Sequence, residues 1–134
     1  MMMTKKPILL CLDDEKIVLD SLKEQIKSVY GKEFEIEFAQ SGEEAFEIIE
    51  EYKEESDYDM IMVISDWLMP GMKGDEFLIE LHKQYPEVVK IMLTGQADED
   101  AVTRARDEAN LYKCLQKPWR KTDLLETISK ALNK

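Results

Sequence analysis

The feature that most constrains the fold of this chain is a fivefold alternation of short apolar runs with longer amphipathic stretches. The runs at 60–65 and 88–93 are apolar almost throughout, which is typical of strands buried on both faces. The run at 34–39 alternates apolar residues with glutamate, which indicates an edge strand with one solvated face. We predict strands at 7–12, 34–39, 60–65, 88–93 and 113–116, followed in turn by helices at 14–30, 41–52, 75–84, 98–109 and 122–132.

Five strand–helix units with short connections predict an α/β fold in which helices cover both faces of a doubly wound parallel sheet. We expect the flavodoxin-like (βα)5 arrangement, which has strand order 2-1-3-4-5. A chain of 134 residues with 44% hydrophobic residues can supply one core of this size. We therefore assign residues 1–134 to a single domain and expect disorder in the first few residues.

The charge balance limits the class of partner. Acidic residues outnumber basic residues 29 to 18, and phosphate backbones are bound by basic clusters, so direct nucleic-acid binding is disfavoured. The longest apolar run, 60–64, is too short to cross a bilayer, and we see no signal-peptide pattern. We expect a cytoplasmic protein without membrane contact. Cys11 and Cys114 lie in strands that are not neighbours in the expected order, which disfavours a disulfide.

Polar residues collect where the predicted strands end. Asp13 and Asp14 follow the first strand, and Asp66, Thr94 and Lys117 follow the third, fourth and fifth. The carboxyl ends of parallel strands share one edge of the sheet, so these side chains are expected to converge there. Carboxylates that converge repel one another unless a hard cation offsets their charge. An open set of two or three aspartates suits Mg²⁺ together with a phosphoryl group, with Mn²⁺ as an alternative.

The remaining members of this set match phosphoryl transfer. Lys117 can pair with Asp66 at rest and with a phosphoryl oxygen afterwards, and Thr94 offers a hydroxyl donor. Asp66 ends the central strand and is our candidate nucleophile. The alternatives are structural: Asp13 and Asp14 could cap the first helix, Thr94 could serve a turn, and Lys117 could be a solvated lysine.

Four segments together resemble the receiver domain of bacterial two-component response regulators, including its chemotaxis-regulator-like members. They are LDDE at 12–15, SDWLMPGM at 65–72, LTG at 93–95 and KPW at 117–119. Each stands at the end of a predicted strand and in the family's order, and the resemblance runs from residue 7 to about residue 132. It implies a signalling domain that turns over no external substrate.

By this resemblance, Asp66 is the phosphoacceptor, and a histidine kinase or histidine phosphotransfer protein is the donor, with acetyl phosphate as a small-molecule substitute. Asp14 would bind Mg²⁺ directly and Asp13 through water. Asp66 and the backbone carbonyl of Leu68 would complete the protein ligands. Leu68 is also one of two positions that tune the lifetime of the phosphoryl group, and Gln96 is the other. Because Leu68 cannot orient an attacking water, we predict a long lifetime.

The resemblance further assigns Thr94 and Lys117 to the phosphoryl oxygens and implies a cis peptide bond before Pro118. The sequence departs from the family at Cys114, where a Tyr or Phe usually acts as a switch. Strand alternation places Tyr112 on the same face as Cys114, so our hypothesis is that Tyr112 partly substitutes.

The family's output face consists of the fourth helix, the fifth strand and the fifth helix, and it binds a downstream protein or an attached output domain. Whether this receiver is freestanding or part of a longer protein stays open, as does a homodimeric active form. Two other function classes are alternatives. A haloacid-dehalogenase-type phosphatase needs a second Asp where Leu68 stands, and an FMN-binding flavodoxin-like protein needs a phosphate cradle where 13–15 is acidic.

Overall fold

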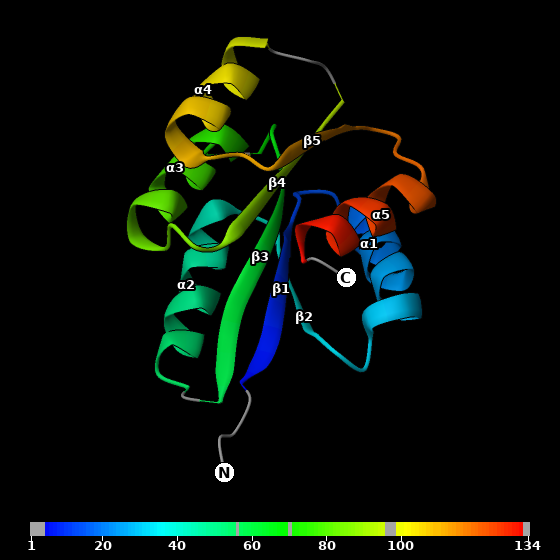
Figure 1. The fold of residues 1–134 in the computed structure, drawn as a ribbon. Helices are drawn as coiled ribbons and strands as arrows, with labels where there is room; N and C mark the ends of the chain where they lie inside the picture. Colours follow the sequence, from blue (N-terminus) through cyan, green and yellow to red (C-terminus); the bar gives the residue numbers. More distant parts are fainter. Residues whose placement is uncertain (1–4, 56, 70, 96–98, 133–134) are drawn as a thin grey trace.

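The computed structural model describes residues 5–55, 57–69, 71–95 and 99–132. Within these ranges a strand and a helix alternate five times (Figure 1). The elements are β1 (Lys6–Leu12), α1 (Lys16–Tyr30), β2 (Glu35–Ala39), α2 (Gly42–Lys53), β3 (Tyr58–Asp66), α3 (Gly74–Gln84), β4 (Val89–Thr94), α4 (Glu99–Ala109), β5 (Lys113–Gln116) and α5 (Lys121–Ala131). The expectation about the first residues falls on 1–4, outside the described residues.

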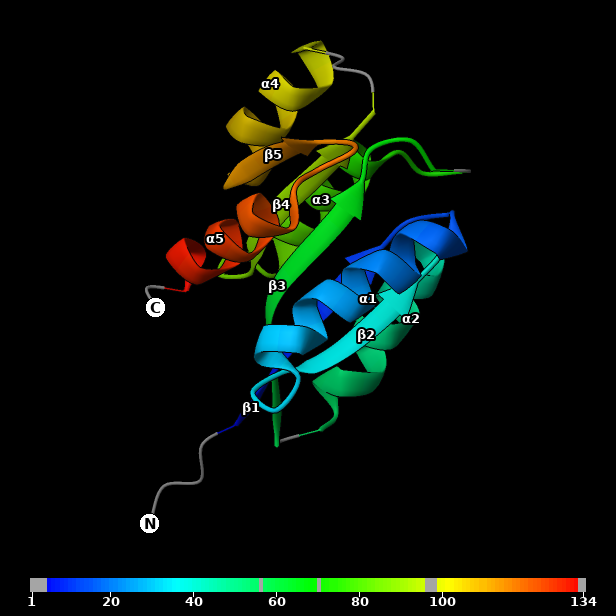
Figure 2. The same cartoon turned by 90° about the vertical axis from the view of Figure 1, so that its right-hand side faces the viewer.

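The sheet confirms the predicted order, β2-β1-β3-β4-β5, with every pair of neighbours parallel. Helices α1 and α5 cover one face, and α2, α3 and α4 cover the other (Figures 1 and 2). The strand that alternates apolar residues with glutamate, β2, is an edge strand as predicted. The flavodoxin-like α/β class is therefore confirmed.

Local hydrogen bonds explain where the first two helices begin. The backbone N–H of Glu15 donates to Asp13 Oδ1 at 2.8 Å, and α1 begins two residues later than predicted, after this turn. Helix α2 begins after its N-cap Ser41, whose spacing from Glu44 is that of a capping box. Ser41 Oγ accepts from the backbone N–H of Glu44 at 3.1 Å, and Glu44 Oε2 accepts from the backbone N–H of Gln40 at 3.3 Å.

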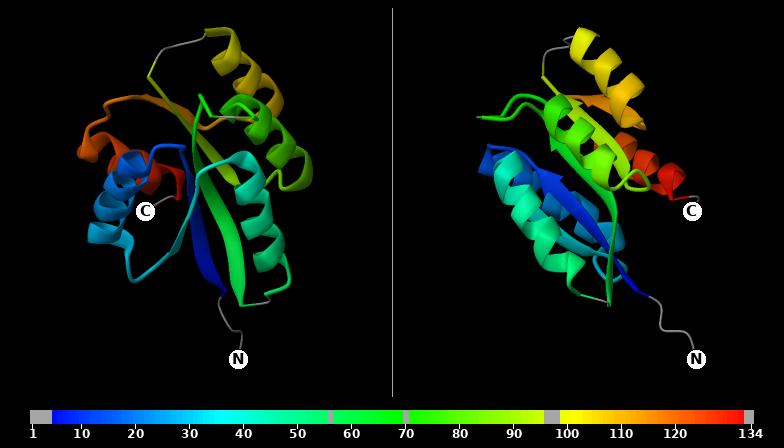
Figure 3. Two further views of the ribbon diagram at one scale, coloured as in Figure 1. Left: turned by 180° about the vertical axis from the view of Figure 1, so that it is seen from behind. Right: turned by 90° about the vertical axis from the view of Figure 1, so that its left-hand side faces the viewer.

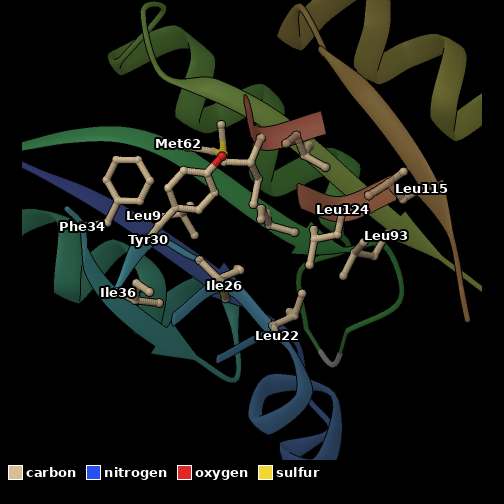
Figure 4. Close-up of a cluster of buried hydrophobic side chains, with 14 of the residues drawn as sticks. Leu9, Leu22, Ile26, Tyr30, Phe34, Ile36, Met62, Leu93, Leu115 and Leu124 are labelled. Carbon is tan, nitrogen blue, oxygen red and sulfur yellow. The ribbon is translucent and has the colours of Figure 1, made fainter. Parts of the chain in front are cut away.

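The core has two layers, one on each face of the sheet. Figure 4 shows the layer beneath α1 and α5, where Leu22 and Leu124 from the helices meet Leu93 and Leu115 from the strands. The other layer includes Phe77, Leu78 and Leu81 of α3, which are fully buried. Each such side chain contributes about 1.5–3 kcal/mol through burial. The two layers hold the strands rigidly, so their ends form a fixed platform.

Helix α4 is attached by small side chains. Its buried residues are Ala101, Ala105 and Ala109, and Val102 is half-buried. Figure 3 shows α4 beside α3 at the end of the helical layer. Alanine removes little apolar area from water, so α4 is held less firmly than α3.

The two cysteines are free and lie in different layers. Cys11 is fully buried under α1 and α5, whereas Cys114 is half-buried in the layer that includes α3 and α4. This confirms the expectation that they form no disulfide. Burial raises the pKa of the Cys114 thiol, although nearby Arg106 lowers it, so the thiol stays protonated near neutral pH.

Candidate functional site

The register of the sheet brings the predicted site residues to one edge. Leu12 pairs with Ser65, Asp66 with Leu93, and Thr94 with Gln116. Asp66 and Thr94 are themselves paired residues. Asp13 directly follows Leu12, and Lys117 directly follows Gln116. Because all strands are parallel, their carboxyl ends lie side by side, and the segments that follow them meet there.

Lys117 links two buried carboxylates at this edge. Its Nζ donates to Asp13 Oδ2 at 2.7 Å and lies 3.0 Å from Asp66 Oδ1. The side chains of Asp13, Asp66 and Lys117 are 0%, 6% and 18% exposed. The pairing with Asp66 agrees with the sequence interpretation. The pairing with Asp13, a residue 104 positions away, was not anticipated.

The electrostatics of this cluster follow from its burial. Burial raises the pKa of Asp66, and the negative charges of Asp13 and Asp14 raise it further, against the lowering effect of Lys117. Burial alone would lower the pKa of Lys117. Its hydrogen bonds to Asp13 and Asp66 outweigh burial and raise the pKa, so the ammonium stays charged. The cluster therefore keeps one cation between two carboxylates.

An acidic group suited to a hard cation lies beside this pair. Carboxylate oxygens of Asp13, Asp14 and Glu15 lie within 4.8 Å of one another, with Asp13 buried and the other two exposed. Only oxygen ligands are offered, and this donor set fits Mg²⁺ or Mn²⁺. Glu15 was not among the predicted metal ligands. Its position directly after two aspartates was the signal that could have identified it.

An open depression of about 610 Å³ lies at this edge of the sheet. Leu68 on its wall is 61% exposed, while Met69 beside it is buried. The depression has room for a cation together with a phosphoryl group. Its lining residues are Asp14, Glu15, Asp66, Trp67, Leu68, Met69, Gly95 and Lys117.

The segment after β3 is held close against the strand end. Gly74 N donates to Trp67 O at 2.7 Å, and a Cβ added to Gly74 would lie 2.2 Å from Asp66 O. Only glycine permits this approach. Trp67 Nε1 donates to Asp75 Oδ1 at 3.1 Å, and Arg104 of α4 donates to the other carboxylate oxygen of Asp75. Sequence reasoning missed this link between the neighbour of Asp66 and α4.

The backbone also positions Lys117. Its N–H donates to Thr94 O at 2.8 Å, and the Lys117–Pro118 bond is cis, as the family resemblance implies. Trp119 Nε1 donates to Gln25 Oε1 of α1 at 2.8 Å, which anchors the segment beyond the proline. Thr94 is buried at the end of β4.

The predicted switch residues Tyr112 and Cys114 lie in different surroundings. Gln96 lies outside the described residues. Tyr112 is 47% exposed and shares a groove of about 260 Å³ with Asp123 and Lys130 of α5, whereas Cys114 packs in the layer that includes α3 and α4. Strand β5 begins only at Lys113, so the alternation that placed Tyr112 with Cys114 starts before the strand does. The substitution of Tyr112 for the usual aromatic residue stays a prediction.

Comparison with solved structures places the fold in a well-populated group. A signal receiver domain of an HD domain-containing protein from Pseudomonas fluorescens superimposes with a TM-score of 0.84, 27% identity and 96% coverage of both chains. A response regulator receiver domain protein from Clostridium thermocellum gives a TM-score of 0.80 and 31% identity, covering 95% of this chain and 94% of that one.

Curated relatives are longer proteins. The hydrogenase transcriptional regulatory protein HoxA of Cupriavidus necator is 28% identical over 98% of this chain, and the sensor kinase CckA of Brucella abortus is 34% identical over 81%. The matched segment is 25% of HoxA and 11% of CckA.

None of the helices that the structure describes has the length and apolar character of a membrane span. The family model of the response regulator receiver domain matches residues 9–129, and the chain therefore belongs to that family.

Proposed function

We propose that Asp66 accepts a phosphoryl group in a two-component signalling system. A carboxylate oxygen of Asp66 attacks the phosphorus of the donor, the bond from phosphorus to the leaving group breaks, and an aspartyl phosphate forms. The observation that carries this proposal is the position of Lys117 Nζ, within hydrogen-bond distance of both Asp13 and Asp66 at the edge of an open depression.

Each member of the cluster has a role in this step. Lys117 favours the ionised form of Asp66 against the effect of burial, and it can move to a phosphoryl oxygen as negative charge accumulates there. Thr94, at the end of the neighbouring strand, would donate its hydroxyl to a second phosphoryl oxygen. Together they offset charge that would otherwise repel the carboxylate nucleophile.

We propose Mg²⁺, or Mn²⁺, as the cofactor. Asp13, Asp14, Asp66 and the Leu68 carbonyl would hold it, and Glu15 would add negative charge at the edge. When bound, the cation would supply positive charge that offsets the negative charge of the phosphoryl group. Asp14 is exposed, which suits a direct ligand, and Asp13 is already bonded to Lys117, which suits contact through water.

The phosphoryl donor would be a histidine kinase or a histidine phosphotransfer protein, and the output face would be α4, β5 and α5. Helix α4 is a suitable switching element, because its buried face is mostly alanine and two alternative positions would differ little in buried area. The link from Trp67 through Asp75 to Arg104 supplies a contact from the site to α4 that does not pass through Cys114.

The test is incubation with acetyl phosphate and Mg²⁺, followed by intact-mass measurement. We expect a mass gain of one phosphoryl group that is lost in Asp66→Asn and kept in Asp20→Asn, an exposed aspartate of α1. Chelation of the divalent cation should abolish the gain. Phosphorylation that persists in Asp66→Asn would contradict the assignment, as would a gain that does not depend on the cation.

A further inference from the structure

A second depression lies between α2 and the segment that joins β3 to α3. Its volume is about 850 Å³, which exceeds that of the depression at Asp66. Helix α2 forms one side, and the other side comes from the β3–α3 connection and the first turn of α3. We call it the α2 groove, and its lining residues are Ser41, Gly42, Glu43, Phe46, Glu47, Glu50, Gly71, Met72 and Glu76.

The floor of the α2 groove is apolar and partly rigid. Phe46 is half-buried, and its ring centroid lies 4.9 Å from that of the fully buried Phe77, so the core fixes its position. Met72 is also half-buried. A Cβ added to Gly42 would lie 3.2 Å from Met72 Sδ, so glycine leaves room for Met72 against α2. A fixed aromatic ring beside an adaptable thioether is a surface that can receive an apolar side chain.

The rim of the α2 groove is acidic. Glu43, Glu47, Glu50 and Glu76 are exposed, and within the described residues none of them has an ion pair or a side-chain hydrogen bond. Glu43 and Glu47 are four residues apart, and Glu47 and Glu50 are three apart. Like charges at these spacings destabilise a helix. Glu43 lies in the first turn of α2, where negative charge stabilises a helix, but the stability of α2 does not explain Glu47 and Glu50.

We propose that the α2 groove binds a basic amphipathic helix of a partner protein. A large apolar side chain of that helix would lie on Phe46 and Met72, and its Lys or Arg residues would face the glutamates of the rim. The part of α2 that lines the groove runs from Gly42 to Glu50. At a rise of about 1.5 Å per residue this is about 12 Å, which is close to two turns of a second helix. Charge complementarity selects this occupant.

A second copy of this chain does not suit the α2 groove. A symmetric dimer through this surface would place two acidic rims against each other, which charge repulsion opposes. The overall charge of −11 disfavours nucleic acid for the same reason. The groove is also separate from α4, β5 and α5, as the right panel of Figure 3 shows for α2 and α4, so the two surfaces can be occupied at once.

The probe for this proposal is a synthetic helical peptide of about four turns, with leucines on one face and lysines on the other. Two control peptides keep its length. One replaces the leucines with serine at unchanged charge, and the other replaces the lysines with glutamate. Binding to the isotope-labelled full chain is measured by NMR titration, which reports both the dissociation constant and the amides that shift.

Two double variants separate the groove from general attraction to an acidic protein. Glu47→Lys with Glu50→Lys reverses two rim charges. Glu51→Lys with Glu54→Lys makes the same change in net charge outside the groove, at the end of α2 and at its C-cap. We expect shifts at α2 and at Met72. We also expect the rim variant to weaken binding about tenfold more than its control.

Three results would overturn the proposal. They are equal weakening by both variants, equal binding of the serine peptide, and shifts confined to other surfaces. The thermal melting of each variant shows whether it is folded. None of the substituted glutamates lies at Asp66, so phosphorylation by acetyl phosphate should be unchanged in both variants. That assay separates a failure here from a failure of the proposed function.

Discussion

Removal of the Lys117 charge should destabilise this domain strongly. Lys117→Met keeps the length of the side chain but leaves Asp13 and Asp66, which are 0% and 6% exposed, without the ammonium. At the observed separations of 2.7 and 3.0 Å, each attraction is about 5–6 kcal/mol at an effective dielectric constant of about 20, before desolvation is subtracted. Loss of one partner from a buried ion pair costs about 3–5 kcal/mol, and we expect about 3 kcal/mol because Lys117 is partly exposed.

This destabilisation should depend on pH. Because burial raises the pKa of Asp66 above its ordinary value of 3.8, the native state keeps a proton that the unfolded state has released. Stability therefore falls as the pH rises from 3.8 through the raised pKa. Without Lys117, that pKa rises further. The part of the difference that comes from the pairing with Asp66 should be small when Asp66 is protonated and should grow as Asp66 ionises.

Urea denaturation followed by circular dichroism measures these free energies. A double-mutant cycle with Asp66→Asn isolates the pair, and we expect Lys117→Met to cost about 1.5–2 kcal/mol less in the Asn background. Lys113→Met, at an exposed lysine of β5, is the control and should change stability by no more than about 0.5 kcal/mol. Additivity within about 0.5 kcal/mol would refute the assignment of the ion pair.

Three further predictions concern the residues around the site. Gly74→Ala should lower the free energy of unfolding by at least about 2 kcal/mol, because its Cβ would lie 2.2 Å from the carbonyl oxygen of Asp66 at the end of β3. Gly95→Ala is the control, because an added Cβ there would have no atom within 4 Å, and equal melting temperatures of the two variants would contradict the reasoning. Leu68→Asn should shorten the lifetime of the phosphoryl group, because an amide can orient water, and an unchanged decay would count against this role. Arg104→Met should leave the buried Asp75 with fewer donors and increase hydrogen exchange in α4, and unchanged protection there would disprove the link.

Much of the fold was predictable because its signals are local. The continuous apolar run in β3 indicates a strand that is buried on both faces, and the alternation in β2 indicates a strand with one solvated face. These patterns predict that β3 is a central strand and that β2 is an edge strand. The capping box at Ser41 predicts the start of α2 in the same way. The start of α1 could not be read from the pattern, because it depends on a hydrogen bond to the Asp13 side chain.

The candidate site was partly predictable for a similar reason. A parallel sheet places the carboxyl ends of its strands at one edge, so the sequence alone groups Asp13, Asp66, Thr94 and Lys117. Which of them touch could not be predicted. Nothing in the pattern indicates that Lys117 bonds Asp13 as well as Asp66. The two side chains are 104 positions apart in the sequence, and only their conformations in the folded protein bring them together.

By itself, then, the sequence determined the order of strands and helices, the parallel sheet and the edge where the chemistry is concentrated, since these follow from periodicity and chain connectivity. The tertiary structure alone decided the double pairing of Lys117, the link from Trp67 to α4 and the apolar floor of the α2 groove. Each of these needs side chains from elements far apart in the sequence to meet within a few ångströms. Such contacts depend on packing in three dimensions, which hydrophobic periodicity does not encode.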